Sequence, residues 1–429
     1  MWLKRHKQNP AHSDTGDYAG AEARHNQKVN VWNGLLKAVE LRLVSPYLGI
    51  NIVRLGAPNL FLGVMIAVPY LAQALAAAVG TRWLLRSRQP QRFTAQLFLA
   101  ARLGFVLLAA VDFWGKNADP ALLFLVAVIV LNLPGSLAVI GWQTLLGQVL
   151  PASGRAQAVM WRQWGMNAIG IVTLLLGGWA IGHAPGVHAY GVLDLIAAAA
   201  GVGEVAIYLR FRAGDYPLPR ITTWHEEGRA LWKDVLYRRF VFGGAVFYFG
   251  WIFLWPVSLR YQVSDLHATN AWMAIWAATN GAATMLALPL WKRLQKPVST
   301  ARLVPFAALL LAGVPVGYMM LPSTGDVLLL NILGGIAGAG MNLLMFVRLL
   351  DVVPESTRLM AISAYGIMTN LAGGMGALVS IAALNISGVP LAAGIAAAVR
   401  LVGALLLVWA TMNRGWAASA PKSVGGLHD

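Results

Sequence analysis

The chain has 429 residues, of which 58% are hydrophobic and 12% are charged, and its mean hydropathy is +0.62. Soluble domains carry about 25% charged residues, so this composition excludes an ordinary water-soluble protein and indicates a polytopic membrane protein. The net charge of +16 comes from basic residues in short loops between apolar segments, which favours contact with anionic lipid headgroups over nucleic acid.

Twelve segments are long and apolar enough to be membrane-spanning helices, since a helix needs about 20 residues to cross the hydrocarbon core. Helix breakers separate them, among them Asp119-Pro120, Pro185-Gly186 and Gly388-Val389-Pro390. The sequence therefore predicts an all-α membrane protein. In chain order the predicted spans are 31–54, 59–84, 93–114, 120–147, 157–182, 188–210, 240–261, 268–291, 301–321, 326–350, 358–384 and 390–413.

Lysine and arginine predict the orientation of these spans. One side collects most of the basic loop residues, whereas the other side carries only Arg54, Lys116 and Arg260. Basic loops face the cytoplasm, so we expect both termini to be cytoplasmic and the number of spans to be even. Twelve spans satisfy this condition, and the expected location is the inner or plasma membrane of the cell.

The segments outside the spans complete the predicted organisation. Residues 1–30 form a polar cytoplasmic tail with no signal peptide, and residues 414–429 form a second tail. Residues 211–239 form the longest cytoplasmic connection, in which Thr223 to Glu226 have the pattern of a capping box before an amphipathic helix. That helix is expected to lie on the inner leaflet and to join two six-helix halves, 31–210 and 240–413; a plain linker helix is the alternative.

A short stretch occurs twice and indicates an internal duplication. LGQVLPASGR at 146–155 aligns with LLDVVPESTR at 349–358, and each copy lies where one apolar segment ends and another begins. Six plus six spans related by a repeat are typical of transporters, because two similar bundles can rock about a central site. The basic loops after spans two and eight also correspond. The residues expected to form a cytoplasmic gate or hinge are Arg82, Pro151, Arg155, Arg293, Pro354 and Arg358.

The 6+6 plan, the paired basic loops and the WQ…LP…R stretch of Trp142 to Arg155 resemble the major facilitator superfamily, from about 30 to 413. The resemblance implies two pseudo-symmetric six-helix bundles and secondary transport of a small organic solute by alternating access, in a monomer. The chain departs from the family's pattern: the loop around Gly80 and its counterpart at 290–297 lack an acid. Span five keeps glycines but lacks the Gly-Pro pair of antiporters, which leaves export only slightly favoured over import. A membrane scaffold or sensor that does not transport is the alternative.

Charged residues inside spans are candidates for function because their insertion costs about 2.5–3.5 kcal/mol. Lys37, Glu40 and Arg42 lie in span one, and the first two are three residues apart, so they can pair on one helix face. Span one lines the central path in the resembling family, which makes Glu40 the first choice for a proton- or substrate-binding carboxylate. The alternative is an ion-paired inner gate, or side chains that reach the headgroups.

The other intramembrane charges have different expected uses. Arg102, Asp194, Glu204 and Arg400 fall on spans that are peripheral in the resembling family, so we expect them to pair within or between helices. Arg162 and Gln163 follow the first hinge in span five and are expected to face the cavity. An unpaired arginine there would favour an anionic substrate.

Amide and aromatic side chains form the third group of candidates. They suit a neutral or amphiphilic organic solute, and the alternative is that the amides hold helices together. The members are Trp142, Gln143, Asn167, Tyr248, Trp251, Asn280, Asn342, Tyr365 and Asn370, with Asn132, Trp255 and Asn331 beside them.

Enzymatic and cofactor-dependent functions find no support in the sequence. It has no GxxxxGK[ST] phosphate-binding loop, no cysteine, and no histidine cluster with the spacing of metal ligands. The expectation is therefore a non-enzymatic membrane protein without cofactor or metal, whose partners are a small-molecule substrate, the lipid bilayer and protons as the coupling ion.

Overall fold

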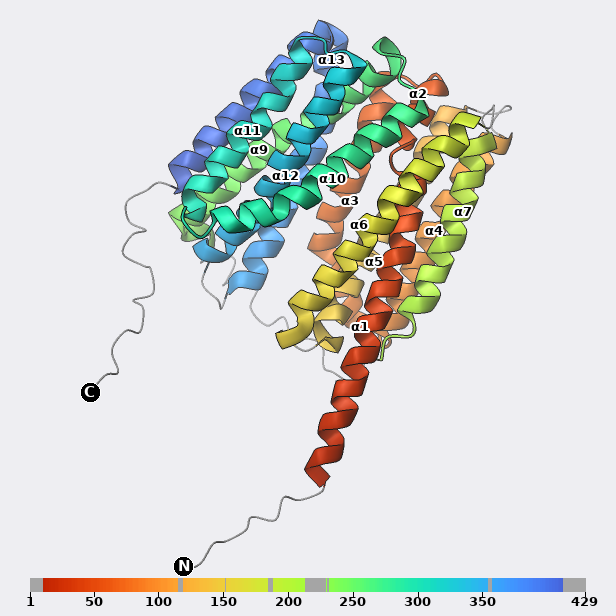
Figure 1. Cartoon of the computed structure of the whole chain (residues 1–429), viewed down its shortest axis with the longest axis vertical. Helices are drawn as coiled ribbons and strands as arrows, with labels where there is room; N and C mark the ends of the chain where they lie inside the picture. The colour runs from red at the N-terminus through yellow and green to blue at the C-terminus, as the bar shows by residue number, and fades with distance from the viewer. Residues whose placement is uncertain are drawn as a thin grey trace, which may run out of the picture. The chain divides into compact units, whose positions relative to one another are not determined.

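The structure is a computed structural model that describes residues 11–114, 119–150, 152–183, 188–212, 229, 231–353 and 357–411. Every regular element in these residues is a helix. The elements are α1 (Ala11–Val44), α2 (Leu48–Arg54), α3 (Asn59–Arg86), α4 (Pro90–Trp114), α5 (Pro120–Val149), α6 (Ala152–His183), α7 (His188–Tyr208), α9 (Val235–Arg260), η2 (Tyr261–Asp265), α10 (Asn270–Leu294), α11 (Thr300–Met319), α12 (Thr324–Val352) and α13 (Arg358–Thr411) (Figure 1).

The long helices follow the predicted spans. Within the described residues, ten helical segments are long and apolar enough to cross a membrane. One of them, Met360–Ala410, contains two predicted spans. The two are separated at Gly388, whose backbone leaves helical geometry with a φ of 70° two residues before Pro390. The expected break at 388–390 is therefore confirmed. The protein is an all-α, multi-pass membrane protein.

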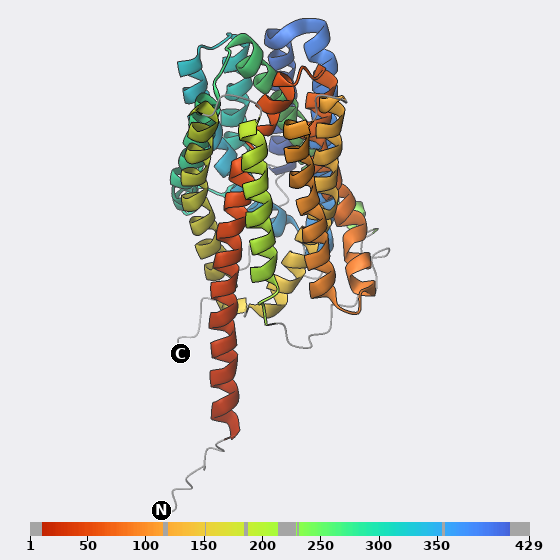
Figure 2. The ribbon, with the colours of Figure 1, turned by 90° about the vertical axis from the view of Figure 1, so that its right-hand side faces the viewer.

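Span one differs from its prediction in two ways. It is not a single helix over 31–54: α1 ends at Val44 and α2 begins at Leu48, because Pro46 lacks the N–H that a continuous helix needs. In addition, α1 begins at Ala11, well before residue 31, so the polar segment expected to be a tail continues the helix. This helix reaches beyond its neighbours at its N-terminal end (Figure 2).

Side-chain caps explain where several helices begin. Asp119 accepts hydrogen bonds from the backbone N–H groups of Ala121 and Leu122 at the start of α5. Asp234 does the same for Leu236 and Tyr237, so α9 begins at Val235 and not at 240 as predicted. The predicted amphipathic helix lies mostly outside the described residues.

The described residues group into two compact units. Unit 1 comes from Met1–Ala57, Leu75–Arg220 and Thr269–Ile275, and unit 2 from Pro58–Ala74, Ile221–Ala268 and Trp276–Asp429. In unit 1, α1 packs against α6 and α7, α7 packs against α4, and α4 against α5. In unit 2, α13 packs against α9 and α11, and α11 against α12. The predicted boundary at 211–239 falls largely on residues outside the description and stays a prediction.

Glycines allow the close helix contacts in both units. A Cβ on Gly104 of α4 would lie 2.6 Å from the Cβ of Leu131 on α5. A Cβ on Gly403 of α13 would lie 2.7 Å from the backbone nitrogen of Phe247 on α9. Both distances are shorter than van der Waals contact, so any larger residue would force these helices apart.

Candidate functional site

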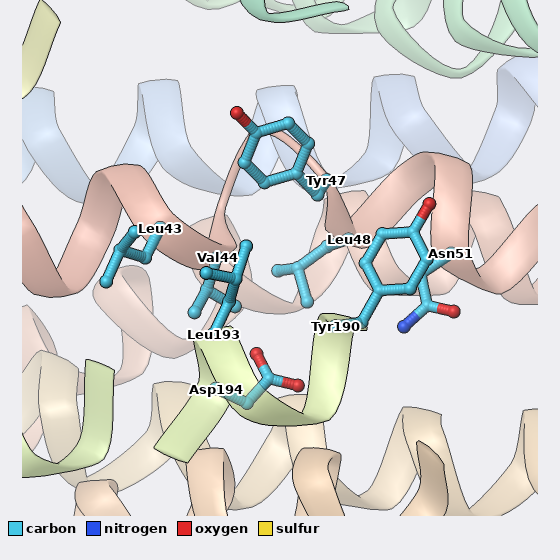
Figure 3. Close-up of a pocket in the computed structure, with 8 residues that line it drawn as sticks. All are labelled: Leu43, Val44, Tyr47, Leu48, Asn51, Tyr190, Leu193 and Asp194. Carbon is cyan, nitrogen blue, oxygen red and sulfur yellow. The ribbon is translucent and has the colours of Figure 1, made fainter. Parts of the chain in front are cut away.

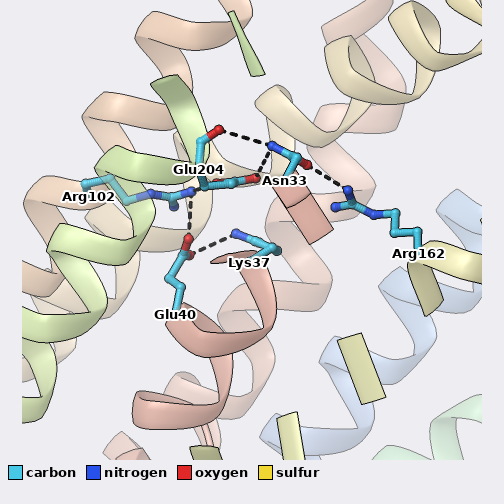
Figure 4. A network of polar contacts seen from close by, with 6 residues as sticks. All are labelled: Asn33, Lys37, Glu40, Arg102, Arg162 and Glu204. Atoms are coloured by element: carbon cyan, nitrogen blue, oxygen red, sulfur yellow. Dashed lines mark hydrogen bonds and ion pairs between the residues drawn. The ribbon is translucent and has the colours of Figure 1, made fainter. Parts of the chain in front are cut away.

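A network of buried charges joins three helices of unit 1 (Figure 4). Lys37 Nζ on α1 lies 2.9 Å from Glu40 Oε1, and Arg102 Nη2 on α4 lies 2.8 Å from Glu40 Oε2. The same Arg102 nitrogen pairs with Glu204 Oε2 on α7. Arg102 is therefore shared between two carboxylates. The expected pairing of Lys37 with Glu40 is observed, and Arg102 and Glu204 pair between helices.

The positions of these residues follow from helical spacing. Asn33, Lys37 and Glu40 are four and three residues apart, so they lie on one face of α1, which packs against α7. Arg102 and Glu204 are 4% and 2% exposed, and Glu40 is 1% exposed. Charges this deeply buried are stable only when each has an aligned partner.

One oxygen of Glu40 is less well satisfied than the rest of the network. Glu40 Oε1 accepts a hydrogen bond from Lys37, whereas Oε2 has no aligned donor among the described residues although Arg102 lies 2.8 Å away. Arg102 instead donates its hydrogen bond to Glu204. Glu40 Oε2 is thus the one of the four carboxylate oxygens in this network that accepts no hydrogen bond from the described residues.

Arg162 extends the network and corrects one expectation. Its Nη1 donates to the carbonyl of Asn30 and to Asn33 Oδ1, each at 2.7 Å, and its guanidinium lies 4.5 Å from the centre of the Trp142 ring. Asn33 Nδ2 in turn donates to Glu204 Oε1 at 3.3 Å. Arg162 is buried, so it is not the unpaired, cavity-facing arginine that was predicted. Sequence position alone could not reveal that α1 supplies its partners.

The remaining candidates of unit 1 lie apart from this network. The half-buried Arg42 packs against α6, where a Cβ on Gly170 would lie 3.2 Å from its Cγ. Gln143 is exposed, and Gln163 is exposed and donates to Asn167 one helical turn further along α6, at 3.3 Å. These residues do not converge on one point.

The candidates of unit 2 form an aromatic and amide cluster. The hydroxyl of Tyr248 on α9 donates to Asn342 Oδ1 on α12 at 3.0 Å, and the Tyr248 and Trp251 ring centres are 5.3 Å apart. Tyr365 on α13 stacks on Phe240 at 5.7 Å, and its hydroxyl has no hydrogen-bond partner among the described residues. The cluster offers aromatic faces, an amide and a free hydroxyl, which suits a neutral solute better than an ion.

Other polar side chains of unit 2 donate to main-chain carbonyls, between helices or within one helix. Asn280 Nδ2 on α10 donates to the carbonyl of Asn331 on α12 at 3.0 Å, and Asn370 donates to the carbonyl of Gly366 within α13. Arg400 is 1% exposed, and its nitrogens donate to the carbonyls of Gly250, Trp251 and Leu311. Arg400 therefore pairs between helices as expected, with carbonyls in place of a carboxylate.

The predicted gate and hinge positions are only partly described. Arg293 is exposed in the last turn of α10. Arg82 and Arg155 lie in α3 and α6, and Arg358 begins α13, but their side chains lie outside the description. Pro151 and Pro354 also lie outside the described residues, so the role of these hinges stays a prediction.

Sequence reasoning missed Asp112 and the two amides on α1 that bind Arg162. Asp112 is 5% exposed and accepts from Asn51 Nδ2 at 3.1 Å. Its position inside the predicted span 93–114 was an available signal, because a carboxyl group in an apolar run needs a partner. Asn30 and Asn33 lie at the predicted start of span one, where polar residues are ordinary.

Comparison with known proteins finds similar solved structures but no match by sequence. No protein-family model matches the sequence, and no curated protein matches it. Among solved structures, the nucleoside transporter NupG is similar with a TM-score of 0.70 and 14% identity, covering 89% of this chain and 99% of that chain. A D-xylose–proton symporter has a TM-score of 0.69, 14% identity and coverage of 89% and 96%. A bacterial homolog of the human lysosomal transporter Spinster has a TM-score of 0.66, 13% identity and coverage of 94% and 97%.

These structures are membrane transporters and not enzymes. At such low identity the likeness establishes the fold. The chain has the fold of the major facilitator superfamily, as the resemblance of its sequence implied.

Proposed function

We propose that the protein is a secondary active transporter that moves a small organic solute by alternating access and is coupled to protons through Glu40. The observation that carries this proposal is the sharing of Arg102 between two buried carboxylates, Glu40 on α1 and Glu204 on α7. If one carboxylate is protonated, Arg102 can keep its ion pair with the other carboxylate. The arginine is then not left unpaired inside the membrane. A D-xylose–proton symporter of similar fold supports the choice of ion.

Protonation of Glu40 would redistribute the contacts of α1. A neutral Glu40 loses its ion pairs with Lys37 and Arg102, while Arg102 keeps its pair with Glu204. The link from Asn33 to Glu204 is unaffected, so α1 loosens from α4 and stays attached to α7. The side chain of Lys37 is 19% exposed, so it is the least buried charged member of the network. A carboxylate that changes helix attachment when it binds a proton can couple the ion to a rocking motion.

The chemistry of unit 2 supports a neutral or amphiphilic substrate. Tyr248, Trp251 and Asn342 supply stacking surfaces and an amide, and Arg162 no longer argues for an anion because it is bound by α1. Export is the proposed direction, with only a slight preference over import, on the glycines that span five shares with antiporters. The proposed location is the cell membrane with both termini cytoplasmic, on the distribution of lysine and arginine.

Reconstitution tests proton coupling. A thermal-shift screen that includes nucleosides, pentoses and hydrophobic drugs first identifies a compound that stabilises the purified protein. Proteoliposomes are then given an inward or outward proton gradient, and accumulation of the labelled compound is measured. We expect gradient-driven accumulation by the wild type and only equilibrating exchange by Glu40→Gln. Glu22→Gln, an exposed glutamate on the same helix, is the matched control and should behave as the wild type. Equal gradient-driven accumulation by wild type and Glu40→Gln would remove Glu40 from the proposed mechanism.

A membrane scaffold or sensor with the same fold is the second candidate function. The loop after span two, which contains Gly80, and the segment 290–297 lack the acidic residue of the major facilitator pattern, and this favours it. A scaffold needs no alternation of access, so labelling of engineered cysteines from the two sides of the membrane distinguishes the two functions.

A further inference from the structure

A small cavity lies in unit 1 where α2 approaches the first turns of α7 (Figure 3). Four of its eight lining residues are aliphatic, two are tyrosines, and Asn51 and Asp194 complete the lining. The cavity has room for about one water. It thus places a single carboxyl group, that of Asp194, against a mainly apolar wall.

Asp194 of α7 is buried in this wall without a partner. The residue is 5% exposed, and its carboxyl group points toward the α1–α2 break in Figure 3. We expected it to pair within or between helices, but among the described residues it forms no hydrogen bond and no ion pair. An ionised carboxylate in this position would therefore lack the donors and cations that compensate a buried charge.

The two tyrosine hydroxyls of the lining are turned to other partners. The hydroxyl of Tyr47 donates to the carbonyl of Leu174 on α6 at 2.5 Å. The hydroxyl of Tyr190 donates to Asn270 Oδ1 at 2.8 Å. Because each hydroxyl has one proton to donate, neither of them stabilises a carboxylate at Asp194.

The amide of Asn51 serves a second carboxyl group, which lies outside the lining. Its Nδ2 donates to Asp112 of α4, whose two oxygens are 3.1 and 3.4 Å away. An ionised carboxylate accepts with both oxygens, so this contact suits a charged Asp112. The charge of Asp112 also acts on Asp194. Because like charges disfavour one another, an ionised Asp112 opposes a second negative charge on Asp194.

The ionisable groups on the helices around α7 supply no cation to the cavity. α7 packs against α1, α4 and α6, and the groups around the cavity are Tyr47 and Arg54 from span one, Asp112 from α4 and Tyr190 from α7 itself. The basic member is Arg54, whose Nη1 donates to the hydroxyl of Tyr190 at 2.8 Å. Arg42 of α1 packs against α6, and on α6 Arg162 and His183 bond to main-chain carbonyls. No described cation therefore pairs with the carboxyl group of the cavity.

We propose that Asp194 is a proton-binding site, whose carboxyl group carries a proton while α2 lies against α7. Among apolar side chains a neutral acid is far less costly than a carboxylate, and its O–H needs one acceptor, which a single water supplies. A metal ion fits poorly, because Ca²⁺ takes about six to eight oxygen ligands and the described residues contain no group of three metal-ligating side chains. The site is separate from the Glu40 network, since Asp194 and Glu204 are about 15 Å apart along the axis of α7. The proposal therefore does not depend on proton coupling through Glu40.

Proton binding at Asp194 is linked to the position of α2. Release passes the proton to water and leaves a charge that one water cannot compensate, so the ionised form favours a state in which α2 lies away from α7. α2 is a helix of its own because Pro46 interrupts span one. Its polar side chains Asn51 and Arg54 reach α4 and α7 through hydrogen bonds. We therefore expect a proton on Asp194 to hold α2 in its observed place.

Infrared difference spectroscopy of the purified full-length protein tests the protonation directly, because the C=O stretch of a carboxylic acid is separate from the bands of a carboxylate. We expect the wild type at neutral pH to show an acid band that Asp194→Asn lacks, and the difference between the two isolates this residue from any other acid. Asp112→Asn should keep the band, since Asp112 is the ionised member of the two. Asp265→Asn, at an exposed aspartate of η2, is the control and should also keep it.

Cysteine labelling tests the link to α2. Leu48→Cys places a thiol in the lining of the cavity, in a chain that has no native cysteine. Its rate of reaction with a maleimide in detergent is measured across a pH series. The rate is divided by that of Met320→Cys, at a residue that is 81% exposed, which corrects for ionisation of the thiol itself. We expect the corrected rate to rise at alkaline pH, and this rise to be lost in Asp194→Asn/Leu48→Cys.

Several results would overturn the proposal. An acid band that is unchanged in Asp194→Asn would show that Asp194 carries no proton, and loss of the band in Asp112→Asn alone would assign the proton to Asp112. A corrected labelling rate that is independent of pH, or whose rise persists in Asp194→Asn/Leu48→Cys, would separate the proton from α2. If Asp194→Asn is not recovered folded, Asp194→Thr, which is also neutral and of similar size, takes its place. Failure of both neutral variants to fold would show that the protein needs a charge at this position.

Discussion

Arg102 is the residue on which the buried network of unit 1 depends most. Its side chain is 4% exposed and serves Glu40 and Glu204 together. Arg102→Met keeps much of the side-chain length but leaves Glu204 with only the amide of Asn33. Removal of one partner from a buried pair costs about 3–5 kcal/mol, so we expect a loss of this size in the free energy of unfolding.

The double variant Arg102→Met/Glu204→Gln separates electrostatics from packing. It removes both members of one pair and leaves the pair of Glu40 with Lys37 in place. We expect it to be more stable than the sum of the single variants predicts, by about 1–3 kcal/mol. Denaturant unfolding of the purified protein in detergent measures all four species. Arg88→Met, at an exposed loop arginine, is the control and should change stability by no more than about 0.5 kcal/mol.

Two outcomes would refute this reasoning. A loss below about 1 kcal/mol in Arg102→Met would show that the carboxylates find other partners or are not charged. Strict additivity in the double variant would show that Arg102 and Glu204 do not interact in the folded protein.

Three further predictions concern packing, capping and the hinges. Gly104→Val should lower the unfolding midpoint by the equivalent of about 1–3 kcal/mol, because the new Cβ would collide with Leu131. Gly182→Val is the control, since a Cβ at Gly182 meets nothing within 4 Å. Asp234→Ala should lower the free energy of unfolding by about 1 kcal/mol, because α9 loses its N-terminal cap. Asp234→Asn, which can still accept the capping hydrogen bonds, should keep most of that stability, and the unfolding midpoint measures both variants. Arg358→Ala should shift the inward/outward balance, read from cysteine labelling, more than it shifts substrate affinity; lost binding with unchanged labelling would contradict this.

Composition and breakers predicted the spans because they are local properties of the chain. The break at Gly388 and the pairing of Lys37 with Glu40 follow in the same way from residues close in sequence. The division of span one at Pro46 could have been predicted on the same ground, since a proline inside a helix removes a hydrogen bond.

Contacts between helices could not be predicted in this way. Nothing in the sequence states that α1 packs against both α6 and α7, and this packing gives Arg162 its partners and brings Arg102 to two carboxylates. The expectation of a cavity-facing Arg162 was wrong for this reason. Asp194 illustrates the same limit, because its cavity exists only where α7 meets the end of α1.

Alternating access is the central claim, and cysteine labelling tests it most directly because the native chain contains no cysteine. Asn331→Cys and Asn342→Cys place single thiols about 16 Å apart along α12, one on each side of its middle. Labelling rates with a membrane-impermeant maleimide are measured from each side, with and without a stabilising compound and a proton gradient. We expect reciprocal changes, in which one thiol becomes more accessible from its side as the other becomes less accessible. Labelling of both thiols from one side only, under every condition, would contradict alternating access and favour the scaffold.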